Sequence, residues 1–237
     1  MKLIRAIFAS AVFCASVFAA EATSATHDYL APDAVDFHTL LSDPPAENSL
    51  ASRGELEVLH QLEMRRTRQD VADAKSVEKH TFVTFAAPVL GPWFNDEKDF
   101  PRTAAVMAKI YAEARPVIVA AKANWNRHRP YIADPTLHPC VARPDNTSYP
   151  SGHSTEGALW GVIFSYLYPE HAADFERRVH DTMWGRMIGG AHFPSDTVAG
   201  RQLGEAIGRA MLKSPALQKD LEDVRAELAA HQLKKAA

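Results

Sequence analysis

Apolar residues recur every three to four positions along much of this 237-residue chain, which is the spacing of amphipathic helices. Leu56, Leu59 and Leu62 share one face of a helix predicted over residues 52–69, where the stretch "SRGE" is a candidate capping box. A second helix is expected at roughly 70–80. Strand-like alternation of apolar and polar residues is scarce, so the pattern predicts an all-α fold.

The same periodicity continues toward the C-terminus. An apolar stripe over residues 106–121 predicts a helix that Pro116 is expected to kink or divide. The apolar segment 82–94 is interrupted by prolines and a glycine, which favours a buried turn or short helical pieces. Residues 130–150 form a predicted loop. Further helices are predicted at about 152–167, 171–187, 195–212 and 216–231.

The N-terminal stretch "MKLIRAIFASAVFCASVFAA" places two basic residues before an apolar run of about fifteen residues. This pattern predicts a secretory signal peptide over residues 1–19, with cleavage after Ala19 or Ala22. The alternative, a membrane anchor, needs roughly 20 apolar residues. We therefore expect a periplasmic protein. Residues 20–50 are Pro-rich and predict an extended arm, followed by a single domain over residues 51–237.

The net charge and the cysteine content limit the kinds of binding partner that we expect. Removal of Lys2 and Arg5 with the signal peptide leaves 24 basic against 29 acidic residues, a formal charge of −5. An acidic chain has no general attraction for nucleic acid or anionic membranes. Cys140 is the one cysteine of the mature sequence, so no intrachain disulfide is expected. His138 and Cys140 fit no usual zinc spacing, and we predict no metal site.

Two short motifs carry candidate chemistry. In "KANWNRHRP", Lys122 precedes Arg129 by seven positions, and taken alone such a pair is typical of solvated surface. In "PSGH", Ser151 can cap the helix that follows, while Gly152 lets backbone approach a ligand closely. His153 stands in the first turn of that helix. Taken alone, this motif is typical of a capped helix with an exposed histidine.

A third motif, "GRMIGGAHFPSD", holds Arg186, His192 and Asp196. A carboxylate four residues after a histidine can bond one imidazole nitrogen, which fixes the tautomer and leaves the other nitrogen with a free lone pair. Such pairs are also common as structural hydrogen bonds. The third motif therefore indicates a function only in combination with the other two.

Together the motifs supply what phosphoryl transfer requires. Its transition state spreads negative charge over three oxygens, so catalysis depends on fixed cationic donors. Lys122, Arg129 and Arg186 provide such donors, and Ser151 and the backbone near Gly152 add neutral ones. Two histidines remain, one to attack phosphorus and one to protonate the leaving oxygen.

In order and spacing, "KANWNRHRP", "PSGH" and "GRMIGGAHFPSD" resemble the three-part signature of the type 2 phosphatidic acid phosphatase (PAP2) superfamily. Within it, the chain is most similar to the bacterial class A non-specific acid phosphatases. The resemblance extends through "LLSDPPAENS", "SYPSGHST" and the last amphipathic helix. It implies a single-domain helical bundle shared with vanadium haloperoxidases, a metal-independent reaction without cofactor, small phosphate monoesters as substrates and often a homo-oligomer.

The resemblance also implies roles for single residues. His192 matches the nucleophile that becomes a phosphohistidine, Asp196 its orienting carboxylate and His153 the general acid. One position departs from the family, which usually has Ser where this chain has Gly185. The phosphate-binding positions are matched by Lys122, Arg129, Ser151, Gly152 and Arg186.

Other functions remain open at this point. A vanadate-dependent haloperoxidase would use the same cationic residues, with His192 as the vanadate ligand. A phosphate-binding protein without turnover would need neither a nucleophile nor an acid, and the presence of His153, His192 and Asp196 argues against it. Lipid phosphatases of the superfamily are typically multi-span membrane proteins, whereas the mature chain has no predicted spanning segment.

Overall fold

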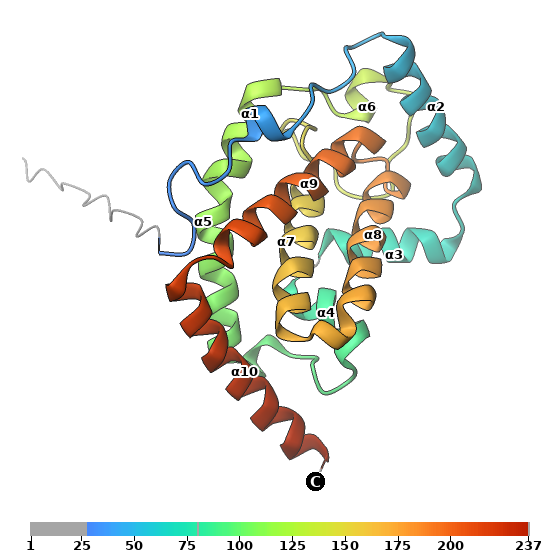
Figure 1. Ribbon diagram of the computed structural model, residues 1–237. Helices are drawn as coiled ribbons and strands as arrows, with labels where there is room; N and C mark the ends of the chain where they lie inside the picture. Colours follow the sequence, from blue (N-terminus) through green and yellow to red (C-terminus); the bar gives the residue numbers. More distant parts are fainter. Residues whose placement is uncertain (1–27, 80, 237) are drawn as a thin grey trace, which may run out of the picture.

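The computed structural model describes residues 28–79 and 81–236, and every regular element in them is helical, which confirms the all-α prediction. The predicted signal peptide lies outside the described residues. Two 3-10 turns, η1 (Glu97–Asp99) and η2 (Pro169–His171), join helices of the bundle. The α-helices in Figure 1 are α1 (Phe37–Leu40), α2 (Leu50–Arg65), α3 (Arg68–Glu78), α4 (Phe82–Leu90), α5 (Pro101–Trp125), α6 (Pro130–Ala133), α7 (Gly152–Leu167), α8 (Ala172–Ile188), α9 (Pro194–Met211) and α10 (Pro215–Ala236).

Helix α7 forms the centre of the bundle, with α8 and α9 against it (Figure 1). The contact between α7 and α9 is made by glycines. A Cβ atom on Gly200 would lie 2.4 Å from the carbonyl oxygen of Ser151, and one on Gly204 would lie 2.1 Å from that of Thr155. These distances are far below van der Waals contact, so the two helix backbones touch where no side chain could fit.

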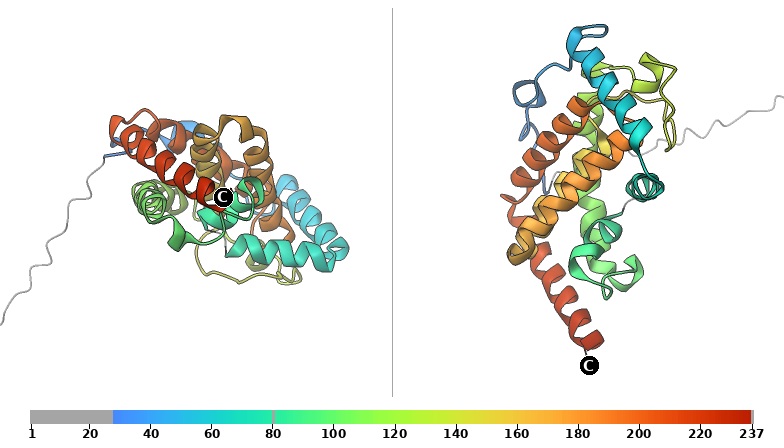
Figure 2. Two further views of the ribbon diagram at one scale, coloured as in Figure 1. Left: turned by 90° about the horizontal axis from the view of Figure 1, so that it is seen from below. Right: turned by 90° about the vertical axis from the view of Figure 1, so that its right-hand side faces the viewer.

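Aromatic side chains fill the space between α4, α7 and α8. The ring of Phe164 stacks on Phe175 with centroids 5.4 Å apart, and Phe85 stacks on the same two rings. All three side chains are fully buried. Helix α10 packs its apolar face on the bundle through Leu217 and Leu221, and its C-terminal end extends past the other helices (Figure 2).

The predicted arm is described from residue 28 onward, and it lies along α5. The buried carboxylate of Glu113 accepts hydrogen bonds from the backbone N–H groups of Tyr29 and Leu30, both at 2.9 Å. Farther along the arm, the carbonyl of Ser42 accepts a hydrogen bond from the hydroxyl of Tyr149 at 2.5 Å. The arm is therefore tied both to α5 and to the segment that precedes α7.

Helix α2 begins earlier than predicted. Ser49 is its N-cap, and the Ser49 hydroxyl accepts a hydrogen bond from the N–H of Ser52 at 3.1 Å. The capping box proposed at Ser52 is therefore wrong, because Ser52 already lies in the first turn. A capping box is present one helix later, where Thr67 and Asp70 bond reciprocally at the start of α3.

Helix α5 continues through Pro116 and is not divided there. A proline inside a helix removes one N–H donor and leaves a carbonyl one turn earlier without its partner. Pro116 and Ala112 lie on the exposed side of α5, where water can satisfy that carbonyl. Exposure of this face explains why the helix tolerates the proline.

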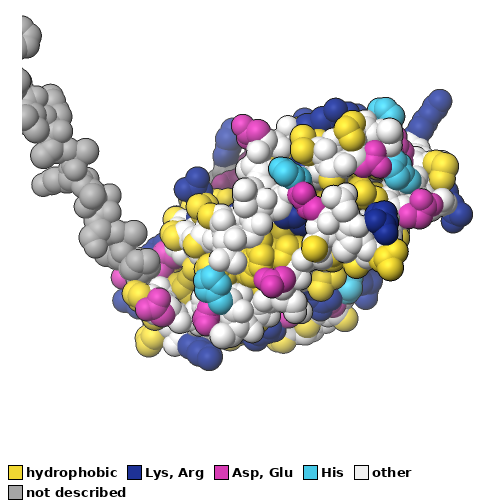
Figure 3. Space-filling view, turned by 90° about the horizontal axis from the view of Figure 1, so that it is seen from above, with side chains coloured by type: hydrophobic (Ala, Val, Ile, Leu, Met, Phe, Trp, Pro, Cys, Tyr) yellow, Lys and Arg dark blue, Asp and Glu magenta, His cyan; other side chains and the backbone are white. Residues whose placement is uncertain are grey.

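None of the helices in the described residues is both long and apolar enough to cross a membrane. Seen from above, the molecule presents basic, acidic and histidine side chains interspersed around a central hydrophobic area (Figure 3). This face therefore carries no single field of positive charge. Attraction for an anion has to come from particular buried residues.

We expect Gly204→Ala to destabilise the protein by about 1–3 kcal/mol, because the new methyl group collides with the α7 backbone. Gly54→Ala is the matched control, since its Cβ would meet nothing within 4 Å on the exposed side of α2. That substitution should stabilise the protein by about 0.5–1 kcal/mol. Urea unfolding measures both, and equal stability of Gly204→Ala and wild type would contradict the close contact.

Candidate active site

The three sequence motifs meet at one end of the bundle, uppermost in Figure 1, although 74 positions separate Lys122 from Asp196. Lys122 lies in the last turn of α5, and Arg129 is the N-cap of α6. Ser151 is the N-cap of α7. Arg186 lies in the last turn of α8, and Asp196 lies in the first turn of α9.

Backbone carbonyls of the loop before α7 hold two of the cations. Lys122 Nζ donates to the carbonyl of Thr147 at 2.7 Å, and Arg129 Nε donates to that of Asn146 at 2.9 Å. Arg186 differs, because its side chain is 1% exposed and its Nε and NH1 atoms have no hydrogen-bond partner within the described residues. These charged donors are therefore able to bind an oxyanion.

These cations lower one another's proton affinity. Burial lowers the pKa of Lys122 to about 7, and the neighbouring charges of Arg129 and Arg186 add to the effect. Burial and Arg129 likewise lower the pKa of Arg186 to about 10. The positive charges are therefore held close together against their mutual repulsion. A bound anion would relieve that repulsion.

His192 is buried between a cation and a carboxylate. Its Nε2 lies 3.1 Å from Arg129 NH1, and its Nδ1 lies 3.4 Å from Asp196 Oδ2. Because a guanidinium only donates, Nε2 must be the acceptor, and the proton of the neutral ring is assigned to Nδ1. Burial, reinforced by Arg129, Lys122 and the nearby Arg186, lowers the pKa of His192 far below its ordinary value. The ring is therefore neutral, with its lone pair on Nε2.

Asp196 is fully buried and accepts several hydrogen bonds. Oδ2 accepts from the N–H of Phe193 at 2.8 Å and from the hydroxyl of Ser148 at 2.5 Å, while Oδ1 accepts from Arg127 NH1 at 2.7 Å. Burial raises the pKa of Asp196, and the charge of Arg127 together with these hydrogen bonds opposes that rise. The carboxylate is thereby held in one orientation beside His192.

The start of α7 shows that the helix-cap interpretation of "PSGH" is correct. The hydroxyl of Ser151 accepts from the N–H of Ser154 at 3.3 Å, and the N–H of Ser151 donates to the carbonyl of Asp196 at 2.9 Å. A Cβ on Gly152 would lie 3.8 Å from Lys122 Cε, so the space beside Gly152 faces the lysine side chain. His153, on the same turn, places Nε2 3.2 Å from the carbonyl of Glu78 on α3.

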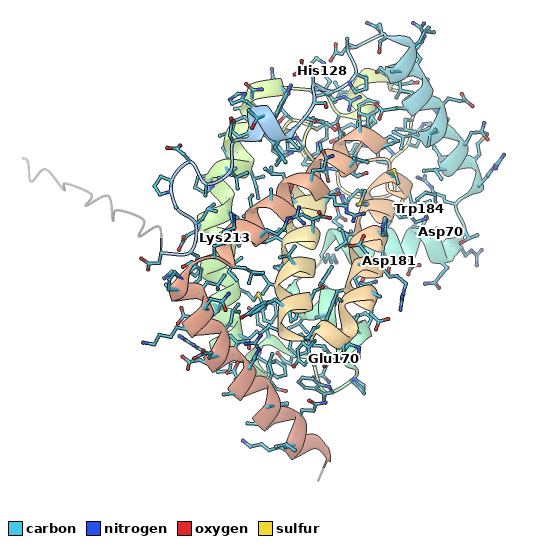
Figure 4. The ribbon with its side chains drawn as sticks, viewed as in Figure 1. Asp70, His128, Glu170, Asp181, Trp184 and Lys213 are labelled. Carbon is cyan, nitrogen blue, oxygen red and sulfur yellow. The ribbon has the colours of Figure 1, made fainter. Side chains whose placement is uncertain are left out.

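Sequence reasoning missed three residues that contact the site. Ser148 and Arg127 hold Asp196, and Glu55 on α2 pairs with Arg127 at 2.7 Å. Arg127 stands inside the first motif, where its burial beside Arg129 could not be read from spacing. The residue between them, His128, is exposed and pairs with Glu47 at 2.6 Å (Figure 4).

The departure at Gly185 has a packing explanation. A Cβ on Gly185 would lie 2.9 Å from Cγ2 of Val77, a buried side chain of α3. The valine therefore occupies the room that a serine side chain at position 185 would need. Arg186, the next residue of α8, is positioned by this close contact between α3 and α8.

A cavity of about 250 Å³ opens between α3 and α8, and Figure 4 shows three of its residues, Asp70, Asp181 and Trp184, at that edge. Asp73 and Gly185 also line the cavity, whereas none of the predicted catalytic residues does. Its lining holds three carboxylates, Asp70, Asp73 and Asp181, against one cation, Arg178, so its net charge disfavours a phosphate ester. Among the described residues, no group of three or more His, Cys, Asp or Glu side chains is arranged to hold a metal ion.

Similar proteins identify the family of this chain. Residues 103–219 match the PAP2 superfamily model. The chain belongs to the PAP2 superfamily. It is 34% identical over 176 residues to a non-specific acid phosphatase of Salmonella typhimurium, an alignment that covers 69% of this chain and 66% of that protein. A non-specific acid phosphatase of Providencia stuartii is 26% identical over 97% of this chain and 98% of its own length.

The structural comparison bears on the fold. A bacterial vanadium-dependent iodoperoxidase superposes with a TM-score of 0.56 and 17% sequence identity, covering 76% of this chain and 53% of the iodoperoxidase. At that identity, the likeness shows a shared fold and nothing about activity. It confirms the helical PAP2-type bundle that the motifs implied.

We expect sulfate to bind the site formed by Lys122, Arg129 and Arg186 more weakly as the pH rises from about 7 to about 9. Sulfate stays doubly charged over this range, whereas Lys122, with its pKa near 7, loses its proton. Calorimetry should show sulfate affinity falling by about tenfold over these two pH units. Lys122→Arg is the control, because its charge persists and the decline should largely disappear. Constant sulfate affinity in the wild type would contradict the lowered pKa.

Proposed function

We propose that this protein is an acid phosphatase that hydrolyses phosphate monoesters through a covalent phosphohistidine on His192. The observation that carries the proposal is the state of His192, a buried neutral imidazole whose tautomer is fixed by Arg129 on one side and Asp196 on the other. A protein that only bound phosphate would need no such nucleophile. The acid phosphatase names of its relatives support the same conclusion.

The first step forms the phosphoenzyme. The phosphate group displaces Arg129 from His192 Nε2, because its oxygens are stronger acceptors for the guanidinium than an imidazole nitrogen is. Nε2 then attacks phosphorus, and the bond between phosphorus and the ester oxygen breaks. The positive charge that develops on His192 is stabilised by Asp196 through Nδ1–H. Lys122, Arg129 and Arg186 stabilise the charge on the phosphoryl oxygens.

His153 handles the protons. The carbonyl of Glu78 can only accept, so Nε2 of His153 carries a hydrogen, and protonation of Nδ1 gives the acidic imidazolium. This imidazolium protonates the departing alkoxide. In the second step the neutral ring removes a proton from water, whose oxygen attacks phosphorus and releases His192 and inorganic phosphate. The requirement for protonated His153 and neutral His192 gives a bell-shaped rate profile with an acidic maximum.

We also propose the setting in which the enzyme acts. The N-terminal pattern of basic and apolar residues supports export to the periplasm. The family resemblance supports a homo-oligomer, which sedimentation of the purified protein would test. Small esters are the proposed substrates, because His153 is half-buried and His192 and Arg186 are almost fully buried, which favours a phosphate on a small leaving group.

The decisive experiment measures hydrolysis of p-nitrophenyl phosphate across pH for wild type, His192→Ala and His153→Ala. We expect His192→Ala to lose activity by at least about a thousandfold and to form no acid-labile phosphoenzyme. His153→Ala should form the phosphoenzyme slowly from p-nitrophenyl phosphate, whose leaving group needs little protonation, and more slowly still from an alkyl phosphate.

Two results would decide against the proposal. Full activity in His192→Ala would remove the phosphohistidine from the mechanism. Vanadate separates the phosphatase from the haloperoxidase alternative, because it resembles phosphate in shape and suits the same cationic donors. We expect vanadate to inhibit ester hydrolysis. Oxidation of iodide by peroxide with vanadate, in the absence of ester hydrolysis, would favour the haloperoxidase.

A further inference from the structure

A chain of buried ion pairs lies behind Asp196. The side chain of Arg127 is 4% exposed, and its NH1 donates to Asp196 Oδ1 at 2.7 Å and to the hydroxyl of Ser195 at 2.8 Å. Its NH2 donates to Glu55 Oε2 at 2.7 Å. The guanidinium also lies over the ring of Phe193, 3.9 Å from the centroid. Arg127 is therefore held between two carboxylates and an aromatic face.

We propose that Arg127 and Glu55 are positioning residues that keep the Asp196 carboxylate ionised and aimed at His192. The inference rests on the proposed function, because it assigns these two residues a part in activating the same nucleophile. Arg127 lies inside the first motif but is not one of its matched phosphate-binding positions, and Glu55 belongs to none of the three motifs. Glu55 lies on α2, outside the matched residues 103–219.

Arg127 helps to fix the orientation of the Asp196 carboxylate. A carboxylate can rotate about its Cβ–Cγ bond and exchange its two oxygens, unless each oxygen has its own donors. Arg127 holds Oδ1 of Asp196, while Phe193 N–H and the Ser148 hydroxyl hold Oδ2. Only Oδ2 is directed at His192 Nδ1. Loss of Arg127 would leave Oδ1 without its charged partner and free the carboxylate to turn.

Arg127 and Glu55 also balance the charge of Asp196. An isolated carboxylate that is fully buried would take up a proton, and a protonated Asp196 could not stabilise the imidazolium of His192. Arg127 compensates the charge of Asp196, and Glu55 in turn compensates that of Arg127. The three side chains together carry one negative charge. The other ionisable groups around Asp196 and His192 are Lys122, Arg129, Tyr149, His153 and Arg186, from α5, α6, the segment before α7, α7 and α8.

Glu55 also fixes the helix that bears Asp196. Its Oε1 accepts from the N–H of Ser195 at 2.7 Å, in the first turn of α9, while Oε2 holds Arg127. One carboxylate thus bonds both the helix start and the arginine that bonds Asp196. Figure 1 shows α2 at the same end of the bundle as the start of α9. Helix α2 is therefore connected to the site through two hydrogen bonds.

The test measures kcat/KM for p-nitrophenyl phosphate as a function of pH. The relevant quantity is the position of the acid limb, the low-pH side of the profile on which kcat/KM falls as the pH decreases. Arg127→Gln should move this limb to higher pH by about one unit, because loss of the positive charge makes both Asp196 and His192 easier to protonate. Glu55→Gln should move it toward lower pH, because the charge of Arg127 is then uncompensated. The double variant should lie near wild type. Ionisation of the substrate is common to all variants and cancels.

Controls separate positioning from general damage. Glu57→Gln neutralises an exposed carboxylate on the same helix, α2, and should leave the acid limb of the pH profile unchanged. Arg127→Lys keeps the charge and should restore the limb, although its plateau should be lower because an ammonium cannot span Asp196 and Glu55 as a guanidinium does. Stabilisation by sulfate should persist in Arg127→Gln, since the residues that hold the anion are intact.

The outcomes are distinct. An unmoved limb in folded Arg127→Gln, or limbs that move in the same direction in Arg127→Gln and Glu55→Gln, would overturn the inference while leaving the proposed function intact. If Arg127→Gln does not fold, the Glu55→Gln limb decides, and only a shift to lower pH supports the inference. Full activity of His192→Ala would overturn the proposed function itself.

Discussion

The structure depends on one constraint: several positively charged side chains are buried close together. Lys122, Arg129 and Arg186 come from three different helices or their ends, and each would be more stable in water or paired with a carboxylate. Packing of the helices holds them together, so part of the folding free energy is stored as repulsion that an oxyanion relieves. Burial lowers the pKa of His192 most, and the same positive charges reinforce that effect, so the ring stays neutral. The attraction for an anion and the neutral state of His192 therefore both depend on the buried positive charge.

The packing that maintains this arrangement is unusually close. Glycines on α9 let its backbone touch that of α7, and the bond from Ser151 N–H to the carbonyl of Asp196 joins the starts of the two helices. On the other side, Gly185 lets α3 approach α8 beside Arg186. Small residues thus set the distances between the charged ones. A methyl group at any of these contacts would separate helices that carry opposite walls of the site.

The sequence predicted the parts of this structure that depend on local pattern. Periodicity located α7, α8 and α9 to within about two residues, and motif spacing selected the residues that converge on His192. Glu55 gave no signal, because its bonds to Arg127 and Ser195 span more than seventy positions. The start of α2 was misplaced because two serines three positions apart can each cap a helix, and only the path of the preceding arm selects Ser49.

The residues around His192 are positioned in two ways, some by local sequence and others by contacts between distant parts of the chain. A short motif can specify a donor that touches the substrate, because its position relative to a helix end is set locally. The charge balance behind Asp196 is set instead by tertiary contacts, so Arg127 and Glu55 can maintain the carboxylate without a fixed spacing between them. Contact with a substrate therefore requires particular residues at fixed spacings within a motif. The balance of charge requires only that the buried residues around Asp196 have the right total charge. The contact between Val77 and Gly185 is of the second kind, because the packing of α3 on α8, and not the spacing within a motif, sets the room beside Arg186.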